Sequence, residues 1–132
     1  MYIPDGYGTV FPYMIVEGAE ELVDFLCKAF GATVEGKTIF PNGRIANIRM
    51  RIGTSSFMMS QAGDETMNAM PASYYLYVED VDTTYEAAIK HGAQKVFEPA
   101  DMPYKERQAG VVDPSGNTWW ISRRLVEEAY DA

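Results

Sequence analysis

The stretch DPSGNTWWIS, residues 113–122, combines the residues of a tight turn with the start of a β-strand. Asp, Pro, Ser, Gly and Asn favour a turn, whereas the aromatic and β-branched residues after them favour an extended chain. Because side chains alternate between the two faces of a strand, Trp119 and Trp120 must point in opposite directions. We expect Trp119 to pack into the core and Trp120 to face a cavity, and a shift of the register by one residue would exchange them.

Two segments of the chain repeat one order of structural signals. Residues 16–34 (VEGAEELVDFLCKAFGATV) and 78–96 (VEDVDTTYEAAIKHGAQKV) each read as the end of a strand, an acidic helix start, an amphipathic helix, a Gly-Ala pair and the start of a strand. A strand pattern precedes each helix, at residues 10–16 and 73–78, and alternating patterns after each helix indicate further strands. Each half therefore predicts the order βαβββ, and the repetition indicates two related modules.

This repeat predicts the fold class. A sheet with a helix on one face needs cover on the other, and two modules side by side supply it by curving around a shared cavity. The predicted class is α+β, with two βαβββ modules forming a curved mixed sheet around a cavity. We expect a single domain over residues 1–132, with module 1 at about 8–62, a linker at about 62–71, module 2 at about 72–124 and a short C-terminal helix at about 125–130.

Composition and charge exclude several classes of protein. No apolar run is long enough to span a bilayer and the first residues show no secretion signal, so we expect neither a membrane protein nor a secreted one. The formal net charge of −8 repels phosphate backbones, so we expect no nucleic-acid partner. The single cysteine, Cys27, cannot form a disulfide within the chain, which together with the missing signal favours the cytoplasm.

The order of these elements, together with residues 78–93 (VEDVDTTYEAAIKHGA) and 110–122 (GVVDPSGNTWWIS), resembles the glyoxalase/bleomycin-resistance superfamily, also called vicinal oxygen chelate proteins. The resemblance covers about residues 10–124. It implies the duplicated fold and a homodimer, because paired chains in this superfamily commonly complete the cavity, and exposed sheet edges favour pairing as well. It also allows a binding role with antibiotic resistance, since the bleomycin-resistance members sequester a toxic compound.

Enzymes of this superfamily hold one divalent metal ion with His and Glu residues at four strand positions. The resemblance places these positions at Phe11, Met58, Ser73 and Trp120. None of the four supplies the carboxylate oxygen or imidazole nitrogen that such ions prefer, so we expect no metal and no other cofactor. The only histidine, His91, lies at the end of the second predicted helix, where we expect it to interact with the helix dipole rather than with a metal.

An aromatic lining is predicted in place of a metal site. Strand alternation places these residues in the cavity: Phe11, Tyr13, Ile15, Met58, Ser60, Ser73, Tyr75, Tyr77, Thr118 and Trp120. Aromatic faces and adaptable methionines suit a flat aromatic or conjugated ligand held by stacking. Residues between them are then expected in the core: Phe57, Met59, Tyr74 and Leu76. The alternative is that the aromatic set closes the cavity and binds nothing.

Polar candidates flank this lining. Arg49 and Arg51 alternate with apolar residues of the third strand and would face the cavity, where a guanidinium could pair with a ligand carboxylate or stack on a ring. The alternative for both arginines is a solvated strand edge paired with acidic neighbours. Glu106 and Arg107, in the segment 104–108, could form a mobile rim.

These expectations combine into one functional hypothesis, which is metal-independent binding or sequestration of an apolar or aromatic small molecule. The competing hypothesis is an enzyme of the lyase, isomerase or dioxygenase type. Such an enzyme would use no metal, or would hold one with ligands at other positions: Glu17, Asp24, His91 and Asp113. A scaffold protein with a closed core is the third possibility.

Overall fold

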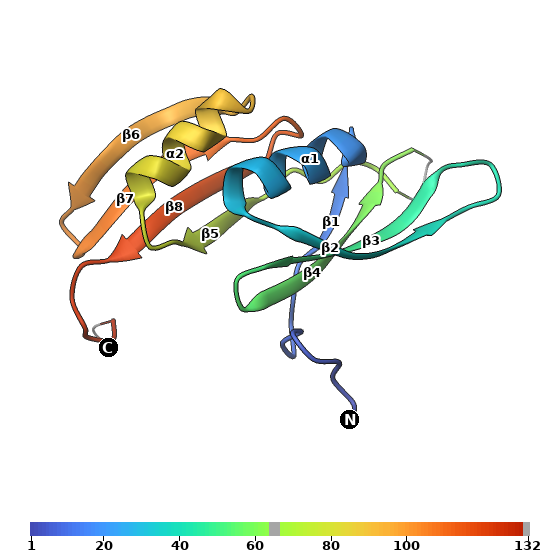
Figure 1. The fold of residues 1–132 in the computed structure, drawn as a ribbon, viewed down its shortest axis with the longest axis horizontal. Coiled ribbons are helices and arrows are strands. Elements are labelled where there is room, and N and C mark those ends of the chain that lie inside the picture. The colour runs from blue at the N-terminus through green and yellow to red at the C-terminus, as the bar shows by residue number, and fades with distance from the viewer. Residues whose placement is uncertain (64–66, 131–132) are drawn as a thin grey trace.

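The computed structural model describes residues 1–63 and 67–130, and the chain folds as two βαβββ modules (Figure 1). The first module contains β1 (Tyr13–Val16), α1 (Ala19–Phe30), β2 (Thr33–Ile39), β3 (Ile45–Ile52) and β4 (Ser55–Gln61). The second contains β5 (Ser73–Tyr77), α2 (Val81–Lys90), β6 (Gln94–Met102), β7 (Glu106–Val112) and β8 (Thr118–Arg124). The α+β class and the duplicated order of elements are confirmed.

Each module forms its own four-stranded sheet. The strand order is β1-β4-β3-β2 in the first sheet and β5-β8-β7-β6 in the second. In both sheets the first strand of the module pairs in parallel with the last, and the other pairs are antiparallel, so both sheets are mixed. The curved surface is therefore built from two neighbouring sheets rather than from one continuous sheet (Figure 1).

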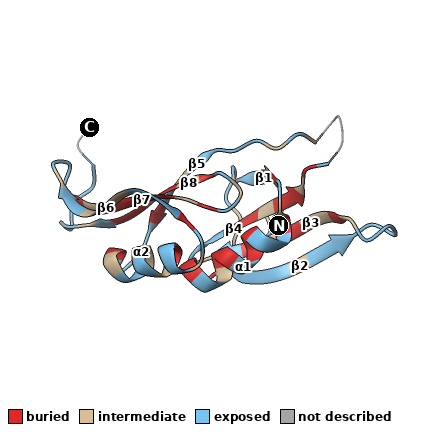
Figure 2. Cartoon of the chain, turned by 90° about the horizontal axis from the view of Figure 1, so that it is seen from above, coloured by how far each residue is buried: buried red, intermediate tan, exposed pale blue. Residues whose placement is uncertain are grey.

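The helices α1 and α2 contact each other and lie on the same side of the two sheets (Figures 1 and 2). In α1 the buried residues recur at helical spacing, as an amphipathic helix requires: Leu22, Phe25, Leu26, Ala29 and Phe30. Neither helix in the described part of the chain is long and apolar enough to cross a membrane.

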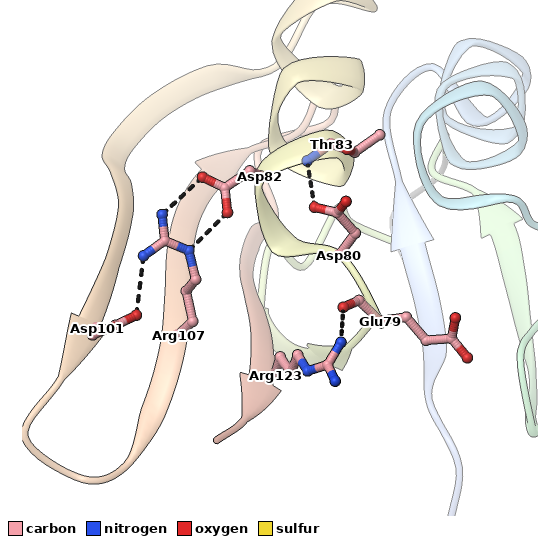
Figure 3. Close-up of polar contacts among 7 residues, drawn as sticks. All are labelled: Glu79, Asp80, Asp82, Thr83, Asp101, Arg107 and Arg123. Carbon is pink, nitrogen blue, oxygen red and sulfur yellow. Dashed lines mark hydrogen bonds and ion pairs between the residues drawn. The ribbon is translucent and has the colours of Figure 1, made fainter. Parts of the chain in front are cut away.

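Side-chain contacts fix the N-terminal end of α2. The carboxylate of Asp80 accepts a hydrogen bond of 3.0 Å from the backbone N–H of Thr83 and so caps the N-terminus of the helix (Figure 3). Arg123 of β8 donates to the backbone carbonyl of Glu79, directly before this cap (Figure 3). His91 is the C-cap residue, which agrees with the position expected from the sequence.

Alternation along the strands gives each sheet a buried face beneath the helices and an open face turned away from them (Figure 2). The buried faces carry the apolar core: Met14, Ile48, Met50, Phe57 and Met59 in the first sheet, and Leu76, Ala109, Val111, Trp119 and Ile121 in the second. Phe57, Met59 and Leu76 are therefore core residues as predicted, and Tyr74 packs against the same cluster.

Trp119 shows how the turn before β8 contributes to this core. Its side chain is 5% exposed and packs against Phe30 and Tyr74, with ring centroids 5.1 and 4.9 Å from its own. Its indole N–H donates a hydrogen bond of 2.7 Å to Asp113 Oδ2. Asp113 of the turn thus satisfies the indole N–H, which is the one polar group of the buried ring. Trp120 lies on the open face, as the sequence predicts.

The expectation that Phe11 lies in the first strand is wrong. β1 begins at Tyr13, after Pro12, which has no N–H to donate to a strand pair. Phe11 instead packs against Tyr7 of the N-terminal segment, with ring centroids 4.7 Å apart.

The short helix expected at about 125–130 is also wrong, because these residues form bends and irregular chain. Six residues are too few to stabilise a helix without strong packing. The backbone carbonyls of Glu128 and Ala129 instead accept hydrogen bonds from the side chain of Arg124. The expected linker at about 62–71 falls partly on residues 64–66, which lie outside the described residues.

Candidate functional site

The open face of the second sheet carries a wide pocket of about 630 Å³. Its walls come from β5, β6, β7 and β8, from the turn between β6 and β7, and from the C-terminal segment: Tyr75, Phe97, Met102, Tyr104, Gln108, Trp120 and Tyr130. Five of these seven side chains are aromatic, one is a methionine and one an amide. We call this the Glu106 pocket, after the carboxylate to which two of its tyrosines are bonded.

Strand register builds the aromatic wall. Trp120 of β8 lies opposite Tyr75 of β5 on one side and Gly110 of β7 on the other. Phe97 of β6 stacks on Trp120, with ring centroids 6.0 Å apart. A Cβ atom at Gly110 would lie 2.8 Å from the ring of Phe97, so the glycine creates the space in which Phe97 reaches across β7 to Trp120.

Glu106 is fully buried, and its carboxylate binds the phenol groups of this face. Tyr75 donates a short hydrogen bond to Oε1, and Tyr77 donates to both carboxylate oxygens at 3.0 Å. The hydroxyl of Tyr130 lies 3.4 Å from Oε1. Tyr75 and Tyr77 meet the same carboxylate because they alternate along β5 and share the open face with Glu106.

The electrostatics of this cluster favour hydroxyl donors. Burial of the phenol, and then its hydrogen bond to Glu106, raise the pKa of Tyr75 to about 12, so Tyr75 is a protonated donor at neutral pH. Within the described ranges, the side chains that contact the Glu106 carboxylate are phenols and not cations. A buried acceptor therefore lies behind two of the tyrosines that line the pocket, Tyr75 and Tyr130.

Arg107 follows Glu106 along β7 and points to the other face of the sheet. Its guanidinium binds both carboxylate oxygens of Asp82 at 2.7 and 2.8 Å and Asp101 at 3.0 Å (Figure 3). These contacts lower the pKa of Asp82 and tie the start of α2 to the β6–β7 hairpin. Glu106 and Arg107 are thus not a mobile rim, because both lie within β7 and one is buried while the other is ion-paired.

The open face of the first sheet is more polar. The hydroxyls of Tyr13 and Ser60 lie 2.5 Å apart, and the amide of Asn47 lies 3.4 Å from Tyr13 and 3.6 Å from the sulfur of Met58. Arg49 lies in the same row, where its guanidinium donates to Asn47 at 3.0 Å.

Arg51 lies further along the same strand face and donates to the backbone carbonyl of Gly53 at 3.0 Å. The residues that alternate with them, Ile48 before Arg49 and Met50 between the two arginines, are fully buried. Arg49 and Arg51 therefore lie on the face opposite the helices, and both bond to neighbouring groups of their own sheet.

The structure divides the residues that the sequence assigns to one lining. Tyr75 and Trp120 line the Glu106 pocket, and Tyr75 and Tyr77 also line a separate cavity of about 310 Å³ between the two sheets. Ser73 is exposed and lines neither of these two spaces. Thr118 begins β8, and the remaining members lie on the first module with the two flanking arginines: Phe11, Tyr13, Ile15, Met58, Ser60, Arg49 and Arg51.

Sequence reasoning did not assign Phe97, Met102, Gln108 and Tyr130 to the lining. The alternation of β7 carries a signal for Gln108, since it shares a face with Glu106 and Gly110 and lies opposite Ser122 of β8. Strand alternation does not predict Phe97 or Tyr130 in the lining. Phe97 follows an irregularity in the β6–β7 register, and Tyr130 belongs to a segment without regular structure.

The donor set does not fit the divalent metal ion that enzymes of the resembled superfamily hold. Phe11, Met58, Ser73 and Trp120 offer no carboxylate or imidazole ligand. Within residues 1–63 and 67–130, no three His, Cys, Asp or Glu side chains gather closely enough to hold a metal ion. That statement includes the alternative ligands considered above: Glu17, Asp24, His91 and Asp113.

Comparisons with known proteins relate the chain to one family. Residues 9–121 match the model of the Glyoxalase/Bleomycin resistance protein/Dioxygenase superfamily. The chain is 28% identical over 130 residues to the uncharacterized protein Mb0911c of Mycobacterium bovis, covering 91% of this chain and 86% of that protein. Its fold is similar to that of TioX from Micromonospora sp. ML1, with a TM-score of 0.74, 22% identity, and 89% and 100% of the two chains covered. It is also similar to TnmS3, an antibiotic binding protein from Streptomyces sp. CB03234, with a TM-score of 0.70, 20% identity, and 94% and 98% covered.

Proposed function

The chain belongs to the glyoxalase/bleomycin resistance protein/dioxygenase superfamily, and from that premise we propose that it binds an apolar or aromatic small molecule without a metal ion. The observation that carries this proposal is the Glu106 pocket, whose volume of about 630 Å³ and largely aromatic walls suit a small-molecule site. A few polar groups among many apolar ones is the pattern that orients a ligand while burying most of its surface.

Stacking is the proposed mode of binding. Trp120 and Phe97 already stack on each other, and Tyr75 and Tyr104 add further ring surface around them. Flat rings fit between such walls in offset-stacked or edge-to-face arrangements, and a flexible methionine side chain adapts to the outline of the ligand. The single methionine of the pocket, Met102, supports the same reading.

We propose sequestration rather than turnover as the role of this binding. The name of TnmS3 describes an antibiotic binding protein of similar fold, which supports a binding role for this chain. The carboxylate of the pocket, Glu106, is occupied by phenol donors rather than free to attack or to abstract a proton from a ligand. A binding role requires only a pocket of suitable shape with aromatic side chains for stacking, and this pocket has both.

A homodimer completes the proposed site. Tyr75 and Tyr77 are about half-exposed on the open face of the second sheet. The open face of the first sheet carries the guanidinium groups of Arg49 and Arg51, and that of the second carries these tyrosine rings, on which a guanidinium can stack. Pairing the first sheet of one copy with the second sheet of another would cover both faces.

Calorimetric titration of metal-free protein with a panel of flat aromatic compounds tests the binding function. We expect saturable binding, about tenfold weaker for Trp120→Ala because the stacking partner is lost. The His91→Ala variant is the matched control, since His91 lies at the C-cap of α2 and should not change the affinity. The proposal fails if binding requires a stoichiometric metal ion, or if Trp120→Ala binds as tightly as the unchanged protein.

A further inference from the structure

Tyr130 differs from the other two tyrosines that contact Glu106. Tyr75 and Tyr77 lie on β5, where strand pairing and ring packing with centroids 5.2 Å apart fix them. Tyr130 comes from the C-terminal segment 125–130, is 63% exposed and makes the longest of the three contacts, at 3.4 Å. Its contact is therefore the one that another molecule can replace most easily.

The C-terminal segment is held over the pocket by a small set of contacts. Arg124 donates to the carbonyls of Glu128 and Tyr104 at 3.0 Å, and its guanidinium lies 4.9 Å from the ring centroid of Tyr130. Lys105 adds an exposed ion pair of 3.5 Å with Glu128. This ion pair is exposed and contributes little, so the segment depends mainly on the hydrogen bonds that Arg124 donates to Glu128 and Ala129. The long contact of Tyr130 with Glu106 can be lost without breaking these bonds.

We propose that the Glu106 pocket takes an aromatic molecule with a phenolic hydroxyl, and that this hydroxyl replaces that of Tyr130 on the Glu106 carboxylate. The inference rests on the proposed binding function and adds the chemical class of the ligand. Tyr130 occupies the position that we assign to the ligand. Its ring lies among the aromatic walls, and its hydroxyl contacts the buried Glu106 carboxylate. A phenol from solution offers the same two groups and competes with it for one place.

A hydroxyl fits this place better than a cation. All the donors that contact Glu106 in the described part of the chain are neutral phenols, which the carboxylate holds at hydrogen-bonding distance. The guanidinium of Arg124 lies against the ring of Tyr130 and would repel a cationic group at the same position. An ether of the same ring has no O–H group, so it cannot donate a hydrogen bond to the Glu106 carboxylate.

Calorimetric titration of the metal-free protein with naphthol, its methyl ether and naphthylmethylamine tests the inference. We expect naphthol to bind about tenfold more tightly than the ether, because it donates a hydrogen bond to a charged acceptor. Tyr130→Ala should raise the affinity for naphthol by about twofold to fivefold, since the internal competitor is gone. The control is Tyr2→Ala, which removes an exposed tyrosine that does not line the pocket and should leave the affinity unchanged.

The outcomes separate this inference from the proposed function. Equal affinities for naphthol and its ether, or tightest binding of the amine, overturn the inference and leave aromatic binding in place. Weaker binding of naphthol by Tyr130→Ala would also overturn the inference, because it would show that Tyr130 helps to hold the ligand and does not compete with it. Absence of saturable binding for all three compounds overturns both. The comparison of the three compounds needs no substitution, so it holds even if the Tyr130→Ala variant does not fold.

Discussion

At the scale of single residues, the turn before β8 and the core beneath α1 depend on one carboxylate. Asp113 Oδ1 accepts hydrogen bonds from the backbone N–H groups of Ser115 and Asn117 at 2.8 and 3.0 Å. Its Oδ2 accepts from the indole of Trp119 at 2.7 Å. A buried carboxylate is stable only when its oxygens are satisfied, and here one side chain serves the turn and the core together.

The raised pKa of Tyr75 gives a pH dependence of stability at the same scale. The pKa is about 12 in the folded chain against an ordinary value of 10, so the unfolded chain loses this proton first as the pH rises. The contribution of Tyr75 is fully present below about pH 10 and is lost as the pH rises towards about 12. We expect the difference in free energy of unfolding between the unchanged protein and Tyr75→Phe to shrink over this window, as measured by urea denaturation at several pH values.

Tyr2→Phe is the control for this measurement, because Tyr2 is 94% exposed. Its difference from the unchanged protein should not vary over the same pH range. A constant difference for Tyr75→Phe would mean that the Glu106 contact does not hold the proton on Tyr75.

At the scale of elements, β7 links the helix side of the second sheet to its open side. Successive residues point to opposite faces, so Arg107 binds Asp82 of α2 while Glu106 binds tyrosines of β5. The same strand carries Gly110, over which Phe97 reaches Trp120. One strand therefore sets the position of α2, the buried acceptor and the aromatic wall.

Gly110→Ala tests how closely β6 and β7 are packed. The added methyl group would lie 2.8 and 3.0 Å from two ring atoms of Phe97 and 3.2 Å from Cβ of Val96, so the ring must move away from Trp120. We expect a loss of about 1–3 kcal/mol in the free energy of unfolding, as for other overpacked sites, and weaker binding of stacked aromatic ligands. Urea denaturation and calorimetric titration measure the two effects.

Gly63→Ala is the matched control, since the new methyl group there would meet Arg44 at an ordinary contact distance of 3.5 Å. Its stability should change by less than about 0.5 kcal/mol. Replacing the clashing ring by the smaller side chain of leucine, with Phe97→Leu added to Gly110→Ala, should restore part of the free energy of unfolding. An unchanged stability of Gly110→Ala would show that the β6–β7 packing is looser than the distances indicate.

At the scale of the whole molecule, the helices cover one side of both sheets and leave the other side open (Figure 2). The first open face carries a polar row with Tyr13, Asn47 and Arg49, and the second carries the Glu106 pocket. Apolar and aromatic groups left on a wide face favour a partner, and the proposed partner is a second copy of the chain.

We expect light scattering to give the mass of two chains. Met58→Asp adds a charge to the open face of the first sheet and should shift the equilibrium towards single chains by at least tenfold in the dissociation constant, because a buried unpaired charge is costly. Lys90→Asp, on the exposed surface of α2, is the control and should leave the mass unchanged. A single-chain mass at high protein concentration for the unchanged protein would refute the dimer.

The sequence by itself determined the duplicated βαβββ order, the two helices and the alternation of faces along β3, β4, β5 and β8. These features follow from local periodicity, so Trp119 and Trp120 could be assigned to opposite faces of the strand from the amino-acid sequence alone. Pro12 also carries a readable signal, because a residue without an N–H favours a strand start after it, which places Phe11 outside β1.

Only the tertiary structure decided which of those faces meet. Tyr75 and Trp120 join one pocket while Tyr13 and Met58 lie on another sheet, because the strands pair within modules and not between them. The contact of Tyr130 with Glu106 spans 24 residues and depends on how Arg124 holds an irregular segment. Contacts of this kind leave no period in the sequence, since they arise from packing between elements rather than from the repeat of any one element.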